Sequence, residues 1–295
     1  MWYHASFMQP LLNLCHTADI AEKSGIHISK HIANKTVWDS FALENPHQPV
    51  TLTGDQATDA VVTSDQCNQI KQYVDQSTVL LDYGCGNGRV AAHLLPQVSL
   101  AGYIGLDSSH EMLKLFRERY DRADAEQATP LLLINADINH PPLIDNTIDV
   151  AVVAAVFRHN HKSVVKKAVY ELARVVKPGG TVLVYGAFPR VFTIVGLGGQ
   201  LYQIALNLLG RPFKNGPVRY YTRGEVKRLH RDFSSVQIIS AGYTVIPQRL
   251  IFLPAPLQTL WQSFIANPIN TFLQKITPAP LERYFATHYD IIAKR

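Results

Sequence analysis

Three glycines spaced two residues apart follow a short apolar run and one acid in residues 79–89, which read VLLDYGCGNGR. An apolar run leading into glycines predicts a buried parallel strand and a tight turn, because glycine reaches left-handed dihedrals without a clash at Cβ. The missing side chains let a ligand lie against bare backbone. The amides at the start of the next helix, expected at about residues 88–95, would then suit a carboxylate or phosphate.

Acidic residues stand at the ends of the next two expected strands. The apolar run 103–106 ends in Asp107, roughly 20 residues after the glycine turn, where an acid can bind a ribose diol. The run 131–134 is followed three residues later by Asp137. Since parallel strands of one sheet end at the same edge, both carboxylates are candidates for the same ligand site.

Further apolar runs predict the rest of the sheet. These runs are 148–153, 181–187, 236–241 and 287–295. The helix expected at 166–176 is followed by Pro178 and Gly179, which are common stop signals. Thr222 and Glu225 fit a capping box that opens a later helix. The alternation of strands and helices favours an α/β fold.

Taken together, these segments resemble the class I S-adenosylmethionine-dependent methyltransferases. The resemblance covers residues 78–186 closely, and it is closest to the ubiquinone and menaquinone methyltransferases. Two strings carry it, LDYGCGNGR at 81–89 and ELARVVKPGG at 171–180. It implies a Rossmann-like α/β fold with seven strands, mostly parallel with an antiparallel last strand, and helices on both faces. It also implies S-adenosylmethionine as the cofactor.

The resemblance further implies which residues hold the cofactor. Those around its methionine part are Asp82, Gly84, Gly86 and Gly88. Its ribose hydroxyls are assigned to Asp107, and the residues around its adenine are Ser108, Asp137 and Ile138. The alternative for Asp107 and Asp137 is that both are ordinary solvated acids at strand ends.

Composition and cysteine usage exclude several other classes. The chain has 295 residues with 47% hydrophobic content, which is ordinary for a globular enzyme. Its three cysteines lie far apart without metal-ligand spacing, so we expect neither a metal site nor a disulfide framework. We also expect a reducing, cytoplasmic location.

Two motifs exclude further classes. Arg89 stands where a dinucleotide fingerprint has its last glycine, which argues against a dehydrogenase. Ala154–Phe157 stands where a base-flipping motif would be expected, so nucleic acid is not an expected partner.

The chain is expected to form a core with additions at both sides. Residues 1–63 would form an N-terminal arm that caps the cleft, with Trp38 as a candidate substrate contact. Residues 64–187 would form the cofactor-binding core. Residues 188–295 would complete the sheet, and two insertions at about 188–216 and 242–286 would form a substrate lid.

The last third of the chain is both basic and apolar. Residues 188–295 contain 13 Lys or Arg and 4 Asp or Glu, whereas the stretches 191–210 and 250–274 contain no charged residue. Glycines interrupt the first stretch and prolines interrupt the second, so neither clearly predicts a spanning helix. Packing over the catalytic face and peripheral contact with a membrane both remain open.

Candidate residues for the chemistry follow the fourth strand of the core. His159 is the candidate general base, because a neutral imidazole takes up a proton near physiological pH; the alternative is that it only packs there. Arg158 is a candidate for binding an acidic substrate group. We therefore expect methyl transfer to a small, lipophilic acceptor, with oxygen favoured over carbon or nitrogen. The alternatives are a polar glycan or antibiotic-like acceptor, and a cofactor-binding regulatory or scaffold protein without turnover.

Overall fold

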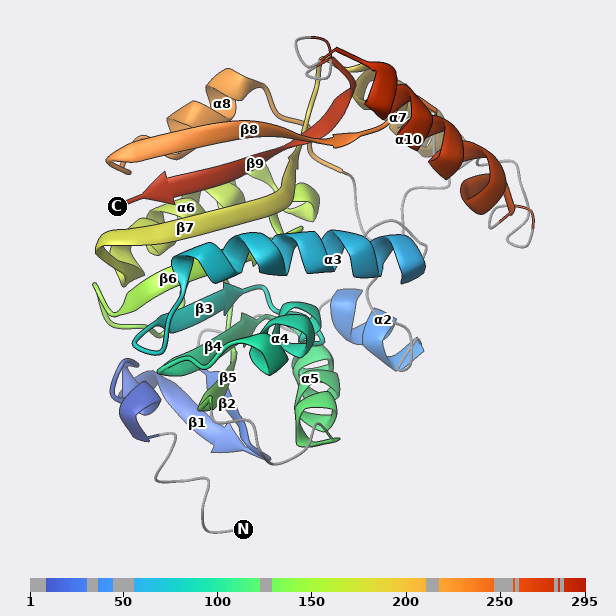
Figure 1. The fold of residues 1–295 in the computed structure, drawn as a ribbon. Coiled ribbons are helices and arrows are strands. Elements are labelled where there is room, and N and C mark those ends of the chain that lie inside the picture. The colour runs from blue at the N-terminus through green and yellow to red at the C-terminus, as the bar shows by residue number, and fades with distance from the viewer. Residues whose placement is uncertain are drawn as a thin grey trace.

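The computed structural model describes residues 9–30, 37–44, 56–122, 129–210, 218–246, 257, 260–278, 281 and 284–295. Within these residues a mixed sheet is covered by helices on both faces, as Figure 1 shows. The predicted α/β architecture is thus confirmed.

All seven expected strands are present in the sheet. The parallel ones are β3 (Val79–Tyr83), β4 (Gly102–Asp107), β5 (Leu131–Asn135), β6 (Ile148–Ala154) and β7 (Val176–Pro189). The last strand, β9 (Ala286–Lys294), runs antiparallel to both β7 and β8 (Ser235–Tyr243) and lies between them. The order across the sheet is β1-β2-β5-β4-β3-β6-β7-β9-β8. The carboxyl ends of β3, β4 and β6 therefore meet at one edge.

The sheet has nine strands rather than the expected seven. A hairpin of β1 (Ile20–Lys23) and β2 (Ile26–Ser29) adds the two extra strands, and β2 pairs with β5. Ser24 and Gly25 turn the hairpin with positive φ angles of 55° and 74°, which suits a two-residue hairpin turn. Part of the expected N-terminal arm therefore extends the sheet and covers the edge of β5.

Two buried clusters lie on opposite faces of the sheet because successive strand residues point to opposite sides. The helices on one face are α3 (Gln56–Ile70), α4 (Arg89–Leu94) and α5 (His110–Arg122), which pack on Leu80, Tyr103 and Leu133. On the other face α6 (Lys162–Val175) packs on Leu81 and Ile104. The remaining named helices include α2 (Val37–Glu44), α7 (Ile194–Leu208), α8 (Arg223–Leu229) and α10 (Asn267–Ile276).

Several boundaries differ from those expected. The helix α6 ends at Val175, and β7 begins directly at Val176, so Pro178 and Gly179 lie in an irregular start of the strand and not at the helix end. The expected boundary between residues 63 and 64 falls inside α3. The capping box of Thr222 and Glu225 forms at the start of α8, as predicted.

The two uncharged stretches do not form a spanning helix in the described part of the chain. No helix found there combines the length and the apolar character needed to cross a bilayer. The first stretch contains α7. Much of the second lies outside the described residues, and its described part contains a π-helical turn, Trp261–Ala266, followed by α10.

Candidate active site

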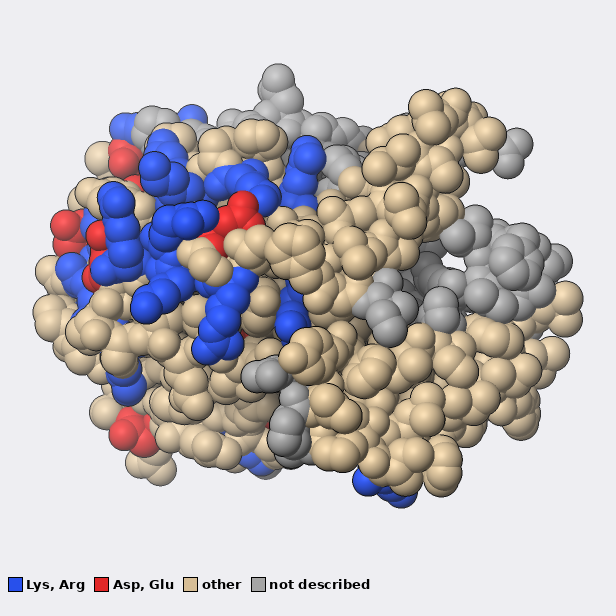
Figure 2. Space-filling model, turned by 90° about the horizontal axis from the view of Figure 1, so that it is seen from above, with Lys and Arg blue, Asp and Glu red and all other residues tan. Residues whose placement is uncertain are grey.

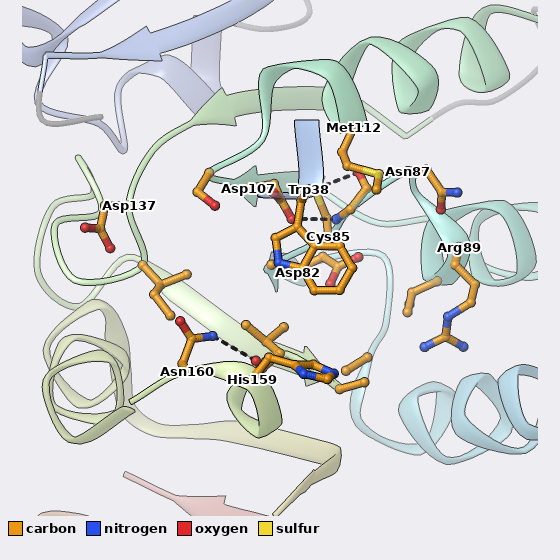
Figure 3. A pocket seen from close by; sticks show the side chains of 18 of the residues that line it. Trp38, Asp82, Cys85, Asn87, Arg89, Asp107, Met112, Asp137, His159 and Asn160 are labelled. Atoms are coloured by element: carbon orange, nitrogen blue, oxygen red, sulfur yellow. Dashed lines mark hydrogen bonds between the residues drawn. The ribbon is translucent and has the colours of Figure 1, made fainter. Parts of the chain in front are cut away.

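A cavity of about 440 Å³ opens at the carboxyl ends of β3, β4 and β6. Figure 3 shows the side chains that line it. Nine of the residues singled out from the sequence are among them: Trp38, Asp82, Gly84, Gly86, Asp107, Ser108, Asp137, Ile138 and His159. The topology therefore gathers residues that are distant in the sequence around one ligand-sized space, as expected for an open α/β sheet.

The three glycines of the turn have different surroundings although all have positive φ. A Cβ at Gly84 would lie 2.4 Å from Val156, and one at Gly88 would lie 2.5 Å from Phe116. Gly84 and Gly88 therefore allow close packing of the chain, and Gly88 lies outside the cavity lining. A Cβ at Gly86 would meet nothing within 4 Å. Gly86 is thus the glycine whose missing side chain leaves space for a ligand.

Asp107 holds the glycine turn as well as lining the cavity. Its two carboxylate oxygens accept hydrogen bonds from the backbone N–H groups of Gly86 and Ser109, both at 2.8 Å. Burial raises the pKa of Asp107, and these hydrogen bonds oppose the shift. Each oxygen still has a lone pair to offer, so the same carboxylate can order the turn and accept from a ligand hydroxyl.

Asp82 is a buried acid with one oxygen left to bind a ligand. The Tyr103 hydroxyl donates to Oδ2 at 2.6 Å, whereas Oδ1 has no hydrogen-bond partner among the described residues. Burial raises the pKa of Asp82 from 3.8 to about 6, against the Tyr103 hydrogen bond and the charge of Arg89. A buried acceptor without a partner is costly, and a cationic ligand group would satisfy it.

Trp38 reaches the cavity because a neighbouring acid fixes its helix. Asp39 accepts hydrogen bonds from the Ser109 hydroxyl at 2.7 Å and from the Glu111 backbone N–H at 3.2 Å. These bonds join α2 to the start of α5. No local sequence pattern indicates the role of Asp39, because this role depends on contacts with residues about 70 positions away in the chain.

His159 packs against Trp38 in the lining of the cavity. The two rings meet edge to face, with centroids 5.9 Å apart and planes inclined by 72° (Figure 3). His159 lies in a single helical turn, Phe157–His159, directly after β6. The candidate base and the candidate substrate contact therefore come together from separate parts of the chain.

Arg158, the other candidate substrate residue, does not line this cavity. Arg158 is half-buried, and burial lowers its pKa while the nearby Tyr220 opposes the shift. Asn87, Met112, Asn139 and Asn160 line the cavity but were not singled out from the sequence. Ala155 lines it too, with a φ of 63° that is strained for a residue other than glycine.

Comparison with known proteins indicates which reaction this site serves. Residues 81–184 match the family model described as a methyltransferase domain. The chain carries a class I S-adenosylmethionine-dependent methyltransferase domain. The methyltransferase is 28% identical over 199 residues to a demethylmenaquinone methyltransferase of Chlamydia trachomatis, covering 66% of this chain and 82% of the relative. It is 32% identical over 160 residues to the ubiquinone/menaquinone biosynthesis C-methyltransferase of Cupriavidus pinatubonensis, covering 53% of this chain and 63% of that relative.

Solved structures share the fold of the methyltransferase at low sequence identity. A putative methyltransferase of Haloferax volcanii, in complex with the Trm112 activator, aligns with a TM-score of 0.53 and 17% identity, over 89% of this chain and 99% of the other. A methyltransferase of Archaeoglobus fulgidus aligns with a TM-score of 0.51 and 13% identity, over 87% and 99% of the two chains.

The cavity fits S-adenosylmethionine, the cofactor of the methyltransferase. The cofactor combines an ammonium group, a carboxylate and a ribose diol. The Asp82 oxygen without a partner among the described residues can accept from the ammonium group. The open space at Gly86 can admit the methionine part of the cofactor, and Asp107 offers an acceptor for the ribose hydroxyls. The donors and acceptors present therefore agree with this cofactor.

We predict that cofactor affinity falls as the pH drops below about 6. Asp82 binds an ammonium only when ionised, and its pKa is raised to about 6 in the free protein, so protonation removes the attraction on the acid side of that value. Tyr103→Phe removes the hydrogen bond that holds this pKa down, and should move the midpoint of the affinity loss to higher pH. Calorimetric titration of the cofactor at a series of pH values measures both midpoints. The series covers roughly pH 5–8, the range in which most proteins are stable.

The control for this prediction is Tyr120→Phe, which removes a tyrosine hydrogen bond, to the Thr129 carbonyl, away from the cavity. Its midpoint should equal that of the unmodified protein. Affinity that stays constant through pH 6, or an equal shift in both variants, would contradict the role of Asp82.

Proposed function

We propose that this methyltransferase transfers a methyl group to the oxygen of a small, lipophilic acceptor that carries an ionisable ring hydroxyl. One observation supports this most. His159, a group able to take up a proton, faces Trp38 in a part of the cavity that Val156 and Val164 also line. A flat apolar ring suits such a surface, because aromatic side chains pack edge to face against other rings.

We propose the following division of roles among the residues of the site. Asp82 and Gly86 hold the methionine part of the cofactor with Gly84 and Gly88, which shape the turn. Asp107 holds the ribose, while Ser108, Asp137 and Ile138 surround the adenine. All but Gly88 line the cavity, which supports the assignment of those residues; Gly88 would act only by shaping the turn.

The protein itself must orient the acceptor and remove its proton. S-adenosylmethionine, when bound, supplies an electrophilic methyl group on a sulfonium. Trp38 orients the acceptor ring, and an imidazole nitrogen of His159 takes the proton from its hydroxyl oxygen. The resulting oxyanion is the nucleophile. Arg158 remains a candidate for binding an acidic substrate group only if its side chain turns toward the cavity.

Methylation of a ring carbon is a second candidate. It is supported by the names of the relatives from Chlamydia trachomatis and Cupriavidus pinatubonensis, which are quinone-pathway methyltransferases. The same proton transfer would serve it, because removing the hydroxyl proton also raises the electron density at the neighbouring ring carbons. His159 therefore has a role under both candidates.

The substrate class can be tested by following the label from methyl-labelled S-adenosylmethionine in cell extract. With purified protein added, we expect label in the organic-extractable fraction, and NMR of the product distinguishes a methoxy group from a ring methyl. Label found only in water-soluble products would favour a polar glycan or antibiotic-like acceptor. Absence of turnover beside measurable cofactor binding would favour a regulatory or scaffold protein.

A further inference from the structure

Large apolar side chains are exposed on the two helical segments that follow β7 and β8. On and after α7 they are Leu197, Leu201, Ile204, Leu208 and Leu209. On the π-helical turn and α10 they are Phe264, Ile265, Ile269, Phe272 and Ile276. We call these ten residues the apolar surface. Apolar patches of this extent mark interaction sites in folded proteins.

The apolar surface belongs to helices with defined positions. Asn270, which is buried, accepts hydrogen bonds from the backbone N–H groups of Val245 and Ile246, both at 2.9 Å, and donates to the Ile246 carbonyl at 3.0 Å. The polar side of α10 thus faces the protein, while Phe264 and Phe272 stay 74% and 61% exposed. Leu197, Leu201, Ile204 and Leu208 recur at helical spacing, so they form one stripe along α7.

The described cavity does not use this surface. None of its lining residues comes from the described part of 188–295. The lid expected from the insertions at about 188–216 and 242–286 therefore remains a proposal, and in the described conformation the exposed side chains of α7 and α10 cover no part of the cavity lining. A binding partner that covers the apolar surface would explain why these side chains are exposed.

A basic cluster lies where α6 and α8 meet, and most of it surrounds one hollow of the surface. It consists of Lys162, Lys166 and Lys167 on α6, Arg223, Lys227 and Arg228 on α8, and Arg231. Figure 2 looks down on the side of the molecule where Figure 1 places α8; on this face Lys and Arg gather at one end, and an uncharged projection lies at the other, where Figure 1 places α7 and α10. Glu225 and Asp232 offset only part of the charge, through ion pairs with Lys162 and Arg231.

We propose that this face docks the protein on an anionic lipid bilayer, with the apolar surface inserted at the interface and the basic cluster against the headgroups. The combination of an uncharged apolar helix face with adjacent Lys and Arg is the pattern that binds such surfaces. Two copies that met through this face would bring two positive clusters toward each other, so the charge favours lipid over a second copy. The proposal stands independently of the methyl acceptor, because binding requires no turnover.

Sedimentation with vesicles tests the proposal. The full chain should bind vesicles made of equal parts phosphatidylcholine and phosphatidylglycerol, and should bind pure phosphatidylcholine at least tenfold more weakly. The double variants Leu201→Ser/Leu208→Ser and Phe264→Ser/Phe272→Ser should each lower binding at least tenfold. These side chains are exposed, so the variants keep their folded core.

The matched control is Leu43→Ser/Val61→Ser, which removes two apolar side chains that are 56% and 62% exposed elsewhere on the molecule. Its binding should equal that of the unmodified protein. Lys166→Gln/Arg228→Gln should weaken binding to the anionic vesicles and reduce its dependence on salt. Equal binding by all variants, or no binding by the unmodified protein, would overturn the proposal. Loss of a dimer in the apolar double variants without any vesicle binding would assign the surface to a second copy instead.

Discussion

His159→Ala should lower turnover by about 10²-fold to 10⁴-fold while the affinity for S-adenosylmethionine stays unchanged. The imidazole is the group proposed to take the acceptor proton, and its ring faces Trp38 at 5.9 Å in the cavity. The assigned cofactor contacts lie on other segments, so binding of the cofactor should survive the change. Calorimetry with the cofactor and rates at saturating acceptor separate the two effects.

A second histidine two residues further on provides the control. His161 is the N-cap of α6 and accepts a hydrogen bond from the backbone N–H of Ser163. His161→Ala should therefore cost about 0.5–2 kcal/mol of stability, as losing a cap does, and leave turnover at saturating acceptor unchanged. If His159→Ala keeps full turnover, or if both variants lose turnover equally, the assignment of His159 as base is wrong.

Gly86→Ala should weaken cofactor binding at least tenfold, which corresponds to about 1.4 kcal/mol. A Cβ at Gly86 meets no protein atom within 4 Å, so the new methyl group would occupy the space left for the ligand. The positive φ of 53° adds backbone strain that is independent of any ligand. The measurement is again the dissociation constant of the cofactor, with thermal unfolding recorded in parallel.

Gly179→Ala separates the two contributions. Gly179 also has a positive φ, of 81°, and a Cβ there would likewise meet nothing within 4 Å, but it lies outside the cavity lining. Both variants should lower the unfolding temperature, and only Gly86→Ala should lower cofactor affinity. Equal affinities for the two variants would show that Gly86 does not border the cofactor.

The central strands could be predicted from the sequence because they are buried on both faces. Continuous apolar runs such as 131–134 and 150–154 have few other interpretations. The hairpin of β1 and β2 was missed because Ile20–Lys23 is four residues long and mostly exposed, so it shows no hydrophobic period. Its position in the sheet depends on pairing with β5, which lies about 100 residues later in the chain.

The glycine turn after β3 and the acids at the end of β4 and after β5 could be placed from local patterns, since each stands at the end of a strand that was already predicted. Asp39 could not, because nothing near it in the sequence indicates the Ser109 hydroxyl as its partner. The strained φ of Ala155 also lacks a local signal, as alanine rarely adopts it without support from the surrounding structure. Residues positioned by tertiary contacts were thus the ones that sequence patterns missed.

The position of β9 in the sheet sets an order of events during synthesis. β8 reaches the rest of the sheet only through β9, which follows it in the chain and pairs with both β7 and β8. While the ribosome is still making β9, the edge of β7 stays open and β8 has no neighbour to join. The cofactor-binding part, β3 to β7, can pair before then, whereas β8 can join the sheet only after β9 has been made. An exposed edge of this kind is a site where nascent chains aggregate, so this methyltransferase is expected to depend on chaperones in that interval more than its stability alone would suggest.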